Sequence, residues 1–538
     1  MRTKQSILLL LCGLSSVSVE AAGWVATKTQ AHPIRQSMSA ARDAGEMAGG
    51  ELVHIAVSLA VRNKEALDEL TDGILSGRRQ PIDDARFMAR YAPTSAQVRQ
   101  VVGHLRRSGF HNIVVSPNNL LVTADGSTST VYGAFRTKLH SIHVDGRQAM
   151  ANMQSAQVPA SLAGIVLAVH GLQTVDRFHT TYRAQDVRLA AAAGAVAHEP
   201  TDFAAIYNAA SLPPASDTVA GIIAAGDLSQ TVADLNRYAS GAGFAAPNVS
   251  VITVGAPGTD TSGTIEWNLD SQTMLAASGG ALKQLQFYAA PSLSNADIIA
   301  AFNAAVSANS AKVVNVSLGE CELGALFSGM TASLDQTLQA AVAHGQTFSV
   351  SSGDSGSYEC GGSLPYQSYP AASPYVIAVG GTTLSTSGNT AYAGETSWSG
   401  GGGGPSATEA APSWQTAAGV LTQSRTRRGV PDIAFDADPA SGALVRMADK
   451  TYQVGGTSLA APLFTAFWSR IQSANGNRLG MPARGIYRYF KANRSLYRDV
   501  VSGSNGAYKA TPGWDYTTGW GSLDVANFNA FIGKTGGF

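Results

Sequence analysis

Charged residues are scarce in this chain of 538 residues, and neither sign is in excess. They make up 14% of the sequence, with 37 Lys and Arg against 37 Asp and Glu. Nucleic-acid binding normally needs a basic excess or stripe, so this balance argues against a nucleic-acid partner. Past the N-terminus, no segment reaches the roughly 18 consecutive apolar residues of a transmembrane helix. We therefore expect a mature protein that works in water as a monomer, without a membrane partner.

Histidine is nearly missing from the second half, which limits the serine chemistry open to the chain. Nine of the ten histidines lie at or before His198, and only His344 comes later. His344 stands before Gly345 at the expected end of a helix, where a cation favours the helix dipole. A Ser-His-Asp triad in the second half would have to use His344. The distribution favours another base and leaves that triad as the alternative.

Only three cysteines are present, Cys12, Cys321 and Cys360. Cys12 falls within an apolar N-terminal run, where the bulky Leu11 argues against a lipoprotein signal. The other two form an even pair in a chain with an export signal, which favours a disulfide over two buried free thiols. In the chain-entropy account, such a bond stabilises the fold by about 3–4 kcal/mol.

Residues 1–21 have the organisation of a signal peptide. Arg2 and Lys4 supply positive charge, an apolar run covers 7–14, and small residues at 19–22 suit a cleavage site. The apolar run is too short to cross a bilayer of about 30 Å as a helix. The sequence therefore predicts a secreted protein, extracellular or periplasmic in transit.

Residues from about 50 to 185 differ from the later part of the chain in their pattern of expected strands and helices. Strands are expected at 53–57, 112–116 and 120–124. An amphipathic helix follows Asn63, its expected cap, and a second helix begins at Thr94 and ends at Gly109. This pattern predicts a compact α+β unit with helices on an antiparallel sheet.

The stretch 184–200 is rich in alanine and poor in side chains that pack. We expect an exposed linker, and the most favourable place for proteolytic separation of two domains. A short Ala-rich helix is the alternative, and the two are compatible because a marginal helix frays readily.

Beyond Pro200 the chain alternates strand-like and helical stretches. Most strand-like runs are apolar without alternation, as in parallel strands covered on both faces. They lie at 219–225, 251–254, 313–318, 347–352 and 376–379, with helical stretches at 295–309 and 333–344. The pattern predicts a doubly wound α/β domain with a mostly parallel sheet. Its site should lie beyond the carboxyl ends of the strands.

A serine next to glycines occurs at Gly455-Gly456-Thr457-Ser458, just before an Ala- and Leu-rich helix. Unpaired backbone N–H groups at a helix start can stabilise an oxyanion, and glycine lets a substrate approach closely. The same residues also suit an ordinary helix N-cap. Alone, this motif leaves a nucleophile and an N-cap equally open.

Carboxylates could supply the base that histidine does not. Glu266 and Asp270 are four residues apart, so on a helix they share one face and couple, with one pKa raised. A solvated helix face is the alternative, which the neighbouring Trp267 argues against. Asp354 follows the apolar run 347–352 at the carboxyl end of a strand, where it could serve a site or form an Asx-turn.

Three segments together resemble the signatures of the sedolisins, the serine-carboxyl peptidases. They are EWNLD at 266–270, SGDSG at 352–356 and GTS at 456–458. The stretches 369–375, 399–403, 430–432 and 437–439 resemble spacers of that family. The cysteines on either side of Asp354 resemble its bacterial, pepstatin-insensitive branch. Several motifs in the right order over nearly the whole chain make this resemblance specific.

The resemblance implies a domain layout. A subtilisin-like catalytic domain would cover residues 201–538, after an inhibitory, ferredoxin-like activation propeptide at 22–183. The linker at 184–200 would then contain the processing site, with self-cleavage expected between about Ala184 and Phe203.

The resemblance also implies roles for four residues. Ser458 would be the nucleophile, Glu266 its general base, Asp270 the residue that orients Glu266, and Asp354 part of the oxyanion hole. A carboxylate can accept a proton in acid, where a histidine would already be charged. Asp354 would have to stay protonated to donate to an oxyanion. Both roles point to an acidic working range.

The family further holds one Ca²⁺ ion near the C-terminus. The matching positions here are Asp499, Val500, Thr511, Gly513 and Asp515. Two carboxylates with backbone carbonyls form a hard-oxygen set that suits Ca²⁺. The family commonly has glycine in place of Thr511, a change that a carbonyl ligand tolerates if the turn does. An ordinary polar turn is the alternative.

We therefore expect an acid-acting serine endopeptidase that matures from a zymogen and forms an acyl-enzyme on Ser458 with protein or peptide substrates. A tripeptidyl-peptidase of the same family is the alternative. An ester hydrolase would need a second glycine where Ala460 stands. A non-catalytic, secreted calcium-binding relative would have lost Glu266, Asp354 or Ser458, and all three are present.

Overall fold

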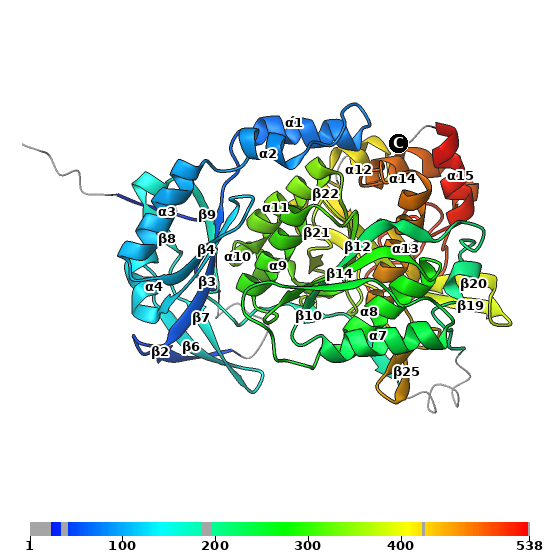
Figure 1. The fold of residues 1–538 in the computed structure, drawn as a ribbon, viewed down its shortest axis with the longest axis horizontal. Coiled ribbons are helices and arrows are strands. Elements are labelled where there is room, and N and C mark those ends of the chain that lie inside the picture. The colour runs from blue at the N-terminus through cyan, green and yellow to red at the C-terminus, as the bar shows by residue number, and fades with distance from the viewer. Residues whose placement is uncertain (1–22, 34–40, 186–195, 422–424, 536–538) are drawn as a thin grey trace, which may run out of the picture.

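The computed structural model describes residues 23–33, 41–185, 196–421 and 425–535. The predicted signal peptide at 1–21 lies outside the described residues, as does most of the predicted linker. Within the described ranges, no helix is long and apolar enough to cross a membrane. An N-terminal unit, blue to cyan in Figure 1, lies beside a larger C-terminal unit coloured green to red.

A four-stranded antiparallel sheet forms the centre of the N-terminal unit, in the order β4-β5-β3-β9. Its strands are β3 (Leu52–Leu59), β4 (His111–Val115), β5 (Leu121–Ser127) and β9 (Val166–His170). Helices α3 (Ser95–Arg107) and α4 (Thr128–Phe135) share one apolar core with this sheet, which includes Leu105, Val122 and Phe135. Smaller sheets flank it, formed by β1 (Trp24–Ala26) with β8 (Gln157–Pro159), and by β2 (Arg42–Glu46), β6 (Leu139–Val144) and β7 (Arg147–Asn152). The predicted α+β unit is confirmed.

The two expected helix starts in this unit differ. Helix α3 begins with a capping box, in which Thr94 and Gln97 bond each other's backbone amides, and Gly109 follows its end at φ +96°. Helix α1 (Lys64–Leu75) also follows the predicted residue, but Asn63 is in the left-handed region and does not cap it. The Asn63 side chain instead donates to the Arg90 carbonyl at 2.7 Å. The expected Asn63 cap was wrong because that amide joins α1 to the end of α2 (Asp84–Arg90).

An eight-stranded sheet forms the centre of the C-terminal unit, in the order β13-β14-β12-β15-β17-β19-β20, with β23 paired to β19. All neighbours are parallel except β19 and β20. The strands are β12 (Ala215–Ala225), β13 (Val249–Thr253), β14 (Leu282–Ala290), β15 (Val313–Val316), β17 (Thr347–Ser351), β19 (Ile377–Ser387), β20 (Ala391–Ser397) and β23 (Ile433–Asp436). The predicted doubly wound domain is confirmed. Strand β14 was not predicted, because its first residues mix Lys and Gln with leucine.

Helices lie on both faces of this sheet (Figure 1). They include α7 (Ser229–Gly241), α8 (Thr264–Ala277), α9 (Asn295–Ala308), α11 (Met330–His344) and α13 (Thr457–Ala474). Shorter helices are α6 (Phe203–Ile206), α10 (Glu322–Phe327), α12 (Ser413–Ala417), α14 (Ala483–Tyr489) and α15 (Val525–Thr535). Peripheral strands are β16 (Leu318–Cys321), β18 (Ser368–Tyr369), β21 (Gly404–Ala410), β22 (Arg427–Val430), β24 (Ala443–Met447), β25 (Lys450–Gly455), β26 (Tyr497–Arg498) and β27 (Ser522–Leu523). Helix α13 is buried from Thr457 to Gln472, so its first turn is held rigidly against the sheet.

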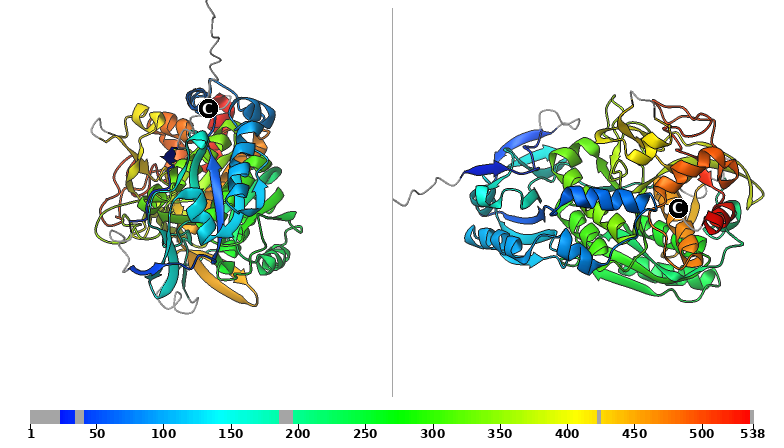
Figure 2. Two further views of the ribbon diagram at one scale, coloured as in Figure 1. Left: turned by 90° about the vertical axis from the view of Figure 1, so that its left-hand side faces the viewer. Right: turned by 90° about the horizontal axis from the view of Figure 1, so that it is seen from above.

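The two units share one apolar core. Ala56 and Leu121 of the N-terminal sheet pack in the same cluster as Ile298 and Phe302 of α9. Helices α1 and α2 reach over the C-terminal unit, and α1 lies along it in the view from above (Figure 2). Burying this much apolar surface between them favours one docked arrangement.

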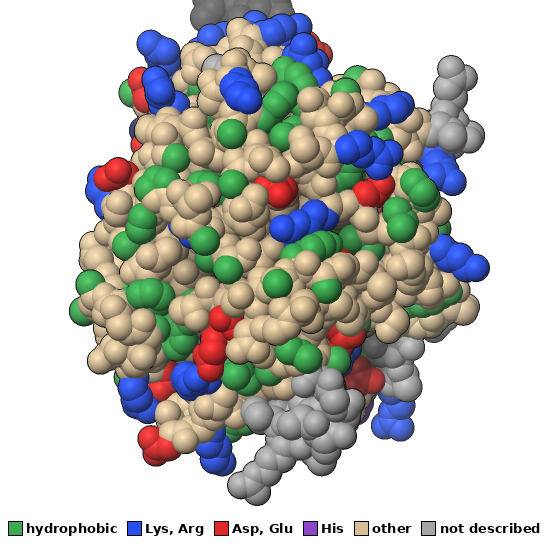
Figure 3. Space-filling model, turned by 90° about the vertical axis from the view of Figure 1, so that its right-hand side faces the viewer, with side chains coloured by type: hydrophobic (Ala, Val, Ile, Leu, Met, Phe, Trp, Pro, Cys, Tyr) green, Lys and Arg blue, Asp and Glu red, His purple; other side chains and the backbone are tan. Residues whose placement is uncertain are grey.

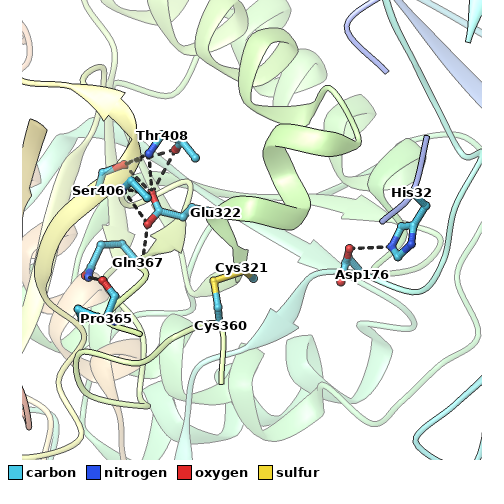
Figure 4. Close-up of a disulfide and its surroundings, with 10 residues drawn as sticks. His32, Asp176, Cys321, Glu322, Cys360, Pro365, Gln367, Ser406 and Thr408 are labelled. Carbon is cyan, nitrogen blue, oxygen red and sulfur yellow. Dashed lines mark hydrogen bonds and ion pairs between the residues drawn. A yellow bond between two sulfur atoms is a disulfide. The ribbon is translucent and has the colours of Figure 1, made fainter. Parts of the chain in front are cut away.

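A disulfide joins Cys321 to Cys360, with an S–S distance of 2.03 Å. It ties the end of β16 to the loop that comes after β17 (Figure 4). The predicted pairing is therefore present in the structure. The bond holds together two segments that both border the candidate active site.

Candidate active site

Ser458 lies in the first turn of α13, directly after a sharp turn at Gly456, whose φ is +105°. Few residues other than glycine adopt that conformation. The Ser458 side chain is buried, and its Oγ donates to Glu266 Oε2 at 2.9 Å. The backbone N–H of Ser458 belongs to the helix start and has no partner within the helix.

Glu266 and Asp270 project from the same face of the buried helix α8, as the spacing predicts. Asp270 Oδ1 accepts from Ser317 Oγ at 2.6 Å. Glu266 Oε1 and Asp270 Oδ2 are buried and have no hydrogen-bond partner among the described residues. Burial raises the pKa of Asp270 to about 8. Burial, followed by the charge of Asp270, raises the pKa of Glu266 well above its ordinary range.

Asp354 lies in the loop after β17, at the carboxyl end of a central strand. Its side chain is 6% exposed. Oδ1 accepts from the backbone N–H and the hydroxyl of Thr457, at 2.8 and 2.9 Å. Oδ2 is buried and has no hydrogen-bond partner in the part of the chain described. Burial raises the pKa of Asp354 to about 7, although the two bonds from Thr457 oppose that shift.

The end of the N-terminal unit passes through this site as an extended strand. Segment β10 (His179–Thr180) pairs antiparallel with β16, and β11 (Arg183–Gln185) pairs antiparallel with β25. Between them, the Thr181 carbonyl accepts from the Ser458 N–H at 3.0 Å. The Thr181 hydroxyl lies 2.9 Å from Ser458 Oγ and 2.7 Å from Ser351 Oγ. A backbone carbonyl and a hydroxyl of the N-terminal unit thus lie directly against Ser458.

Asp354 Oδ2, the oxygen without a hydrogen-bond partner among the described residues, lies near the Thr181 carbonyl. A Cβ added at Gly456 would lie 2.5 Å from Thr181 O and 2.6 Å from Asp354 Oδ2, so both atoms flank one point of the backbone. Arg183 is close by in the chain and donates from Nη2 to the Asp354 carbonyl at 3.2 Å, with its Nε 4.0 Å from Oδ2. Sequence reasoning missed the 179–185 strand. Its Thr-Thr-Tyr run was a weak β signal, but its pairing partners are distant in the chain.

The contacts of His344 are with residues outside the candidate active site. Its Nδ1 lies 2.9 Å from Asp84 Oδ1 on α2, and its ring packs edge-on against Phe87. Burial lowers the pKa of His344, which favours the neutral ring. These contacts place His344 between the two units, so the alternative triad on His344 is wrong.

The predicted metal ligands come together around one short loop. Asp499 accepts from the Gly513 N–H at 2.9 Å and pairs with Arg494, while Asp515 Oδ2 accepts from the Thr511 N–H at 2.8 Å. The carbonyl oxygens of Val500, Thr511 and Gly513 accept no hydrogen bond among the described residues. This hard-oxygen set fits Ca²⁺ in its chemistry. No cluster of three or more His, Cys, Asp or Glu side chains suited to a metal occurs in the described residues.

Comparisons with known proteins agree with the geometry. Residues 39–175 match the activation domain of pro-kumamolisin, and residues 217–521 match the subtilase family. Sedolisin from Pseudomonas sp. (strain 101) is 44% identical to this chain, over 95% of it and 93% of the relative. The chain belongs to the sedolisin family. It is therefore a serine-carboxyl peptidase with an activation propeptide and a subtilisin-like fold.

Other sedolisins extend this comparison. Xanthomonalisin from Xanthomonas sp. (strain T-22) is 43% identical, over 89% of this chain and 65% of the relative. A solved structure of Pseudomonas sedolisin, complexed with two molecules of pseudo-iodotyrostatin, superposes with a TM-score of 0.61 at 46% identity. That match covers 64% of this chain and 100% of the other.

Proposed function

We propose that this sedolisin is a secreted, acid-acting endopeptidase that cleaves peptide bonds through an acyl-enzyme on Ser458. One observation carries the proposal. Ser458 Oγ donates to Glu266 while a peptide carbonyl accepts from the Ser458 N–H, so nucleophile, base and acceptor meet at one point. Glu266 takes the hydroxyl proton as Ser458 attacks, and returns it to the leaving amine.

Asp270 holds Glu266 ready for that step. Two carboxyl groups in a dry pocket share one proton, because ionising both would place like charges together. In the precursor the strongly raised pKa of Glu266 favours the shared proton on Glu266. Transfer of that proton to Asp270 leaves Glu266 as the carboxylate that accepts from Ser458. Residues 179–185, here called the seated strand, cover the Glu266–Asp270 pair. Removal of this strand admits water, which lowers the raised pKa of Glu266 towards the acid range.

Asp354 completes the oxyanion site. Thr457 holds Oδ1, which leaves Oδ2 directed at the substrate carbonyl. Below its raised pKa, Asp354 carries a proton on Oδ2 and donates it as negative charge develops on the carbonyl. The N–H of Ser458 is the second donor.

The seated strand favours endopeptidase over tripeptidyl-peptidase activity. It is paired before Thr181, along β16, and after it, along β25. Upstream of Thr181 the chain continues through Phe178 and back into the N-terminal unit. A cleft closed after three residues would not accept such a chain, so an open cleft that accepts internal peptide bonds fits best.

The N-terminal unit inhibits the enzyme in cis by occupying this cleft. We assign residues 22–183 to the propeptide, 184–200 to the processing linker and 201–538 to the catalytic domain, with 1–21 as the export signal. On the face in Figure 3, basic and acidic side chains lie interspersed rather than gathered by sign. That distribution suits a monomer with peptide substrates better than a nucleic-acid partner.

One structural Ca²⁺ ion would be held by Asp499, Asp515 and the carbonyls of Val500, Thr511 and Gly513. When bound, it would neutralise the two carboxylates and join the loop around 511–515 to the end of β26. We assign it no step in the reaction.

The test is hydrolysis of acid-denatured haemoglobin at pH 3–5 by wild type, Ser458→Ala, Glu266→Gln and Asp217→Ala, with every precursor matured in trans by wild-type enzyme. Ser458→Ala and Glu266→Gln should each lose at least about 1,000-fold in kcat, as when one of the nucleophile–base pair is removed. The exposed Asp217 is the control and should keep full activity. A Glu266→Gln enzyme with wild-type kcat would reject Glu266 as the base.

A further inference from the structure

Glu359 has a carboxyl group that the proposed mechanism does not use, and it lies against the loop that carries Asp354. Its Oε1 accepts from the Ser355 N–H at 2.8 Å. A Cβ added at Gly353 would lie 2.1 Å from the Glu359 Cδ, so the carboxyl fills the space beside Gly353 where a side chain would be. Glu359 therefore contacts the residue on each side of Asp354.

The turn at residues 353–355 is packed against the Glu359 carboxyl. The Ser355 N–H donates to Glu359 Oε1 from one side of the turn, and the carboxyl lies against Gly353 on the other. Gly353 has φ +112°, a conformation that favours glycine, and the missing side chain leaves the space that the Glu359 carboxyl fills. Thr457 holds the Asp354 side chain itself, so Glu359 is a second support that fixes its direction.

Glu359 is itself fixed to the scaffold. Its N–H donates to the Tyr366 carbonyl at 3.1 Å. The next residue, Cys360, is bonded to Cys321 at the end of β16, the strand that pairs with the seated segment. The Cys321–Cys360 disulfide therefore restrains the backbone next to Glu359, whose carboxyl supports the Asp354 loop.

We propose that Glu359 is a positioning residue for Asp354, holding the 353–355 backbone so that Asp354 Oδ2 meets the oxyanion. This inference rests on the proposed role of Asp354 as a donor. The Glu359 and Asp354 carboxyl groups also affect each other electrostatically. Burial, and then the charge of Asp354, raises the pKa of Glu359 well above its ordinary range, so Glu359 is neutral in acid. A glutamine should then replace it well, and alanine should not.

The chain offers a matched control in Glu322. It directly follows Cys321, as Glu359 directly precedes Cys360, and it is buried. Its carboxyl accepts from Gln367, Ser406 and Thr408, which lie around it in Figure 4. It thus supports a neighbouring loop through the same kind of contact, but touches none of residues 353–355 in the described structure. Loss of Glu322 should lower stability and leave chemistry intact.

The experiment compares Glu359→Gln, Glu359→Ala, Glu322→Ala, Asp354→Ala and the Asp354→Ala/Glu359→Ala pair. All precursors are matured in trans by wild-type enzyme and checked by mass. Glu359→Ala should lower kcat about 10- to 100-fold with KM changed less than about threefold, as expected when an oxyanion donor is misplaced. It should also move the alkaline limb to lower pH, since water then reaches Asp354. Glu359→Gln should stay within about threefold of wild type.

The double variant separates positioning from a general structural role. If Glu359 acts through Asp354, its removal should cost less than about twofold in the Asp354→Ala background. Full additivity, wild-type kcat in Glu359→Ala, or the same kcat loss and pH shift in Glu322→Ala would each overturn the inference. Should Glu359→Ala not fold, Glu359→Gln with a loss above about 10-fold at acid pH would overturn it. Wild-type activity in Asp354→Ala would instead reject the proposed oxyanion role itself.

Discussion

The carbonyl oxygen of Thr181 lies 3.0 Å from the amide nitrogen of Ser458, so the propeptide presents one of its own peptide bonds to the residue that we propose as nucleophile. The Thr181 hydroxyl also lies 2.9 Å from Ser458 Oγ. We expect substrates to bind as this propeptide segment does, by antiparallel pairing with β16 and β25. The same contacts that hold the precursor inactive place a bond where it can be cut.

The first prediction concerns where maturation begins. The seated carbonyl favours a first cut between Thr181 and Tyr182, just before the 184–203 window that the sequence predicts, with later trimming inside that window. Acidified wild-type precursor, sampled over time by mass spectrometry, should show a product that begins at Tyr182 before any shorter one. Ser458→Ala precursor should stay full length at pH 4. If it matures as fast as wild type without added protease, self-cleavage is wrong.

The second prediction concerns the acid trigger. Three propeptide aspartates bind the catalytic domain: Asp68 accepts from Gln339 at 2.7 Å, Asp72 lies 3.6 Å from Arg484, and Asp84 lies 2.9 Å from His344. Replacing the three carboxylates by neutral amides removes the negative charge from these contacts and weakens docking of the propeptide. Asparagine at all three should let the precursor mature at a pH about one unit higher, followed on gels across a pH series.

Asp145→Asn is the control for that series. Asp145 belongs to the same domain but is exposed in the turn between β6 and β7. Its variant should mature with the wild-type pH profile. An unchanged profile in the triple variant would show that the trigger lies elsewhere, for example in the carboxyls of the active site.

The third prediction concerns the pH dependence of turnover. Asp354, with its pKa near 7 in the precursor, is protonated below that pH and ionised above it. The donor is therefore present in acid and lost as pH rises, so Asp354 should set the alkaline limb of kcat. Asp354→Asn should keep some turnover and lose part of the alkaline fall. Asp354→Ala should lose about 100-fold or more in kcat at all pH values. Asparagine and alanine variants equally inactive, with folding unchanged, would contradict a simple donor.

The fourth prediction concerns calcium. A chelator at working pH should lower the melting temperature and then activity, because an ion bound only to the native state stabilises it. Asp499→Ala should have the lower melting temperature without chelator, and added Ca²⁺ should not restore it. The exposed Asp217→Ala enzyme should respond to chelator as wild type does. Unchanged melting in Asp499→Ala, with no chelator sensitivity, would remove the proposed site.

Local sequence was enough for much of the site, since the pairing of Glu266 with Asp270 follows from helix periodicity and the place of Asp354 from the end of an apolar strand. Strand β14 was missed because Lys283 and Gln284 interrupt its apolar pattern. The seated strand at 179–185 was missed for a different reason. Its structure comes from pairing with strands more than 130 residues away, and local residue preferences carry little of that information.

The shared core of the two units has a consequence for the timing of activation. While the chain is intact, the inhibitor is tethered, so its effective concentration at the cleft does not depend on the volume around it. Self-cutting should then be first order in precursor. After the cut, binding of the propeptide through the same apolar contacts is bimolecular. Dilution then determines whether the freed propeptide stays bound to the catalytic domain. Export into a large external volume would thus finish, by mass action, the process that the first cleavage begins.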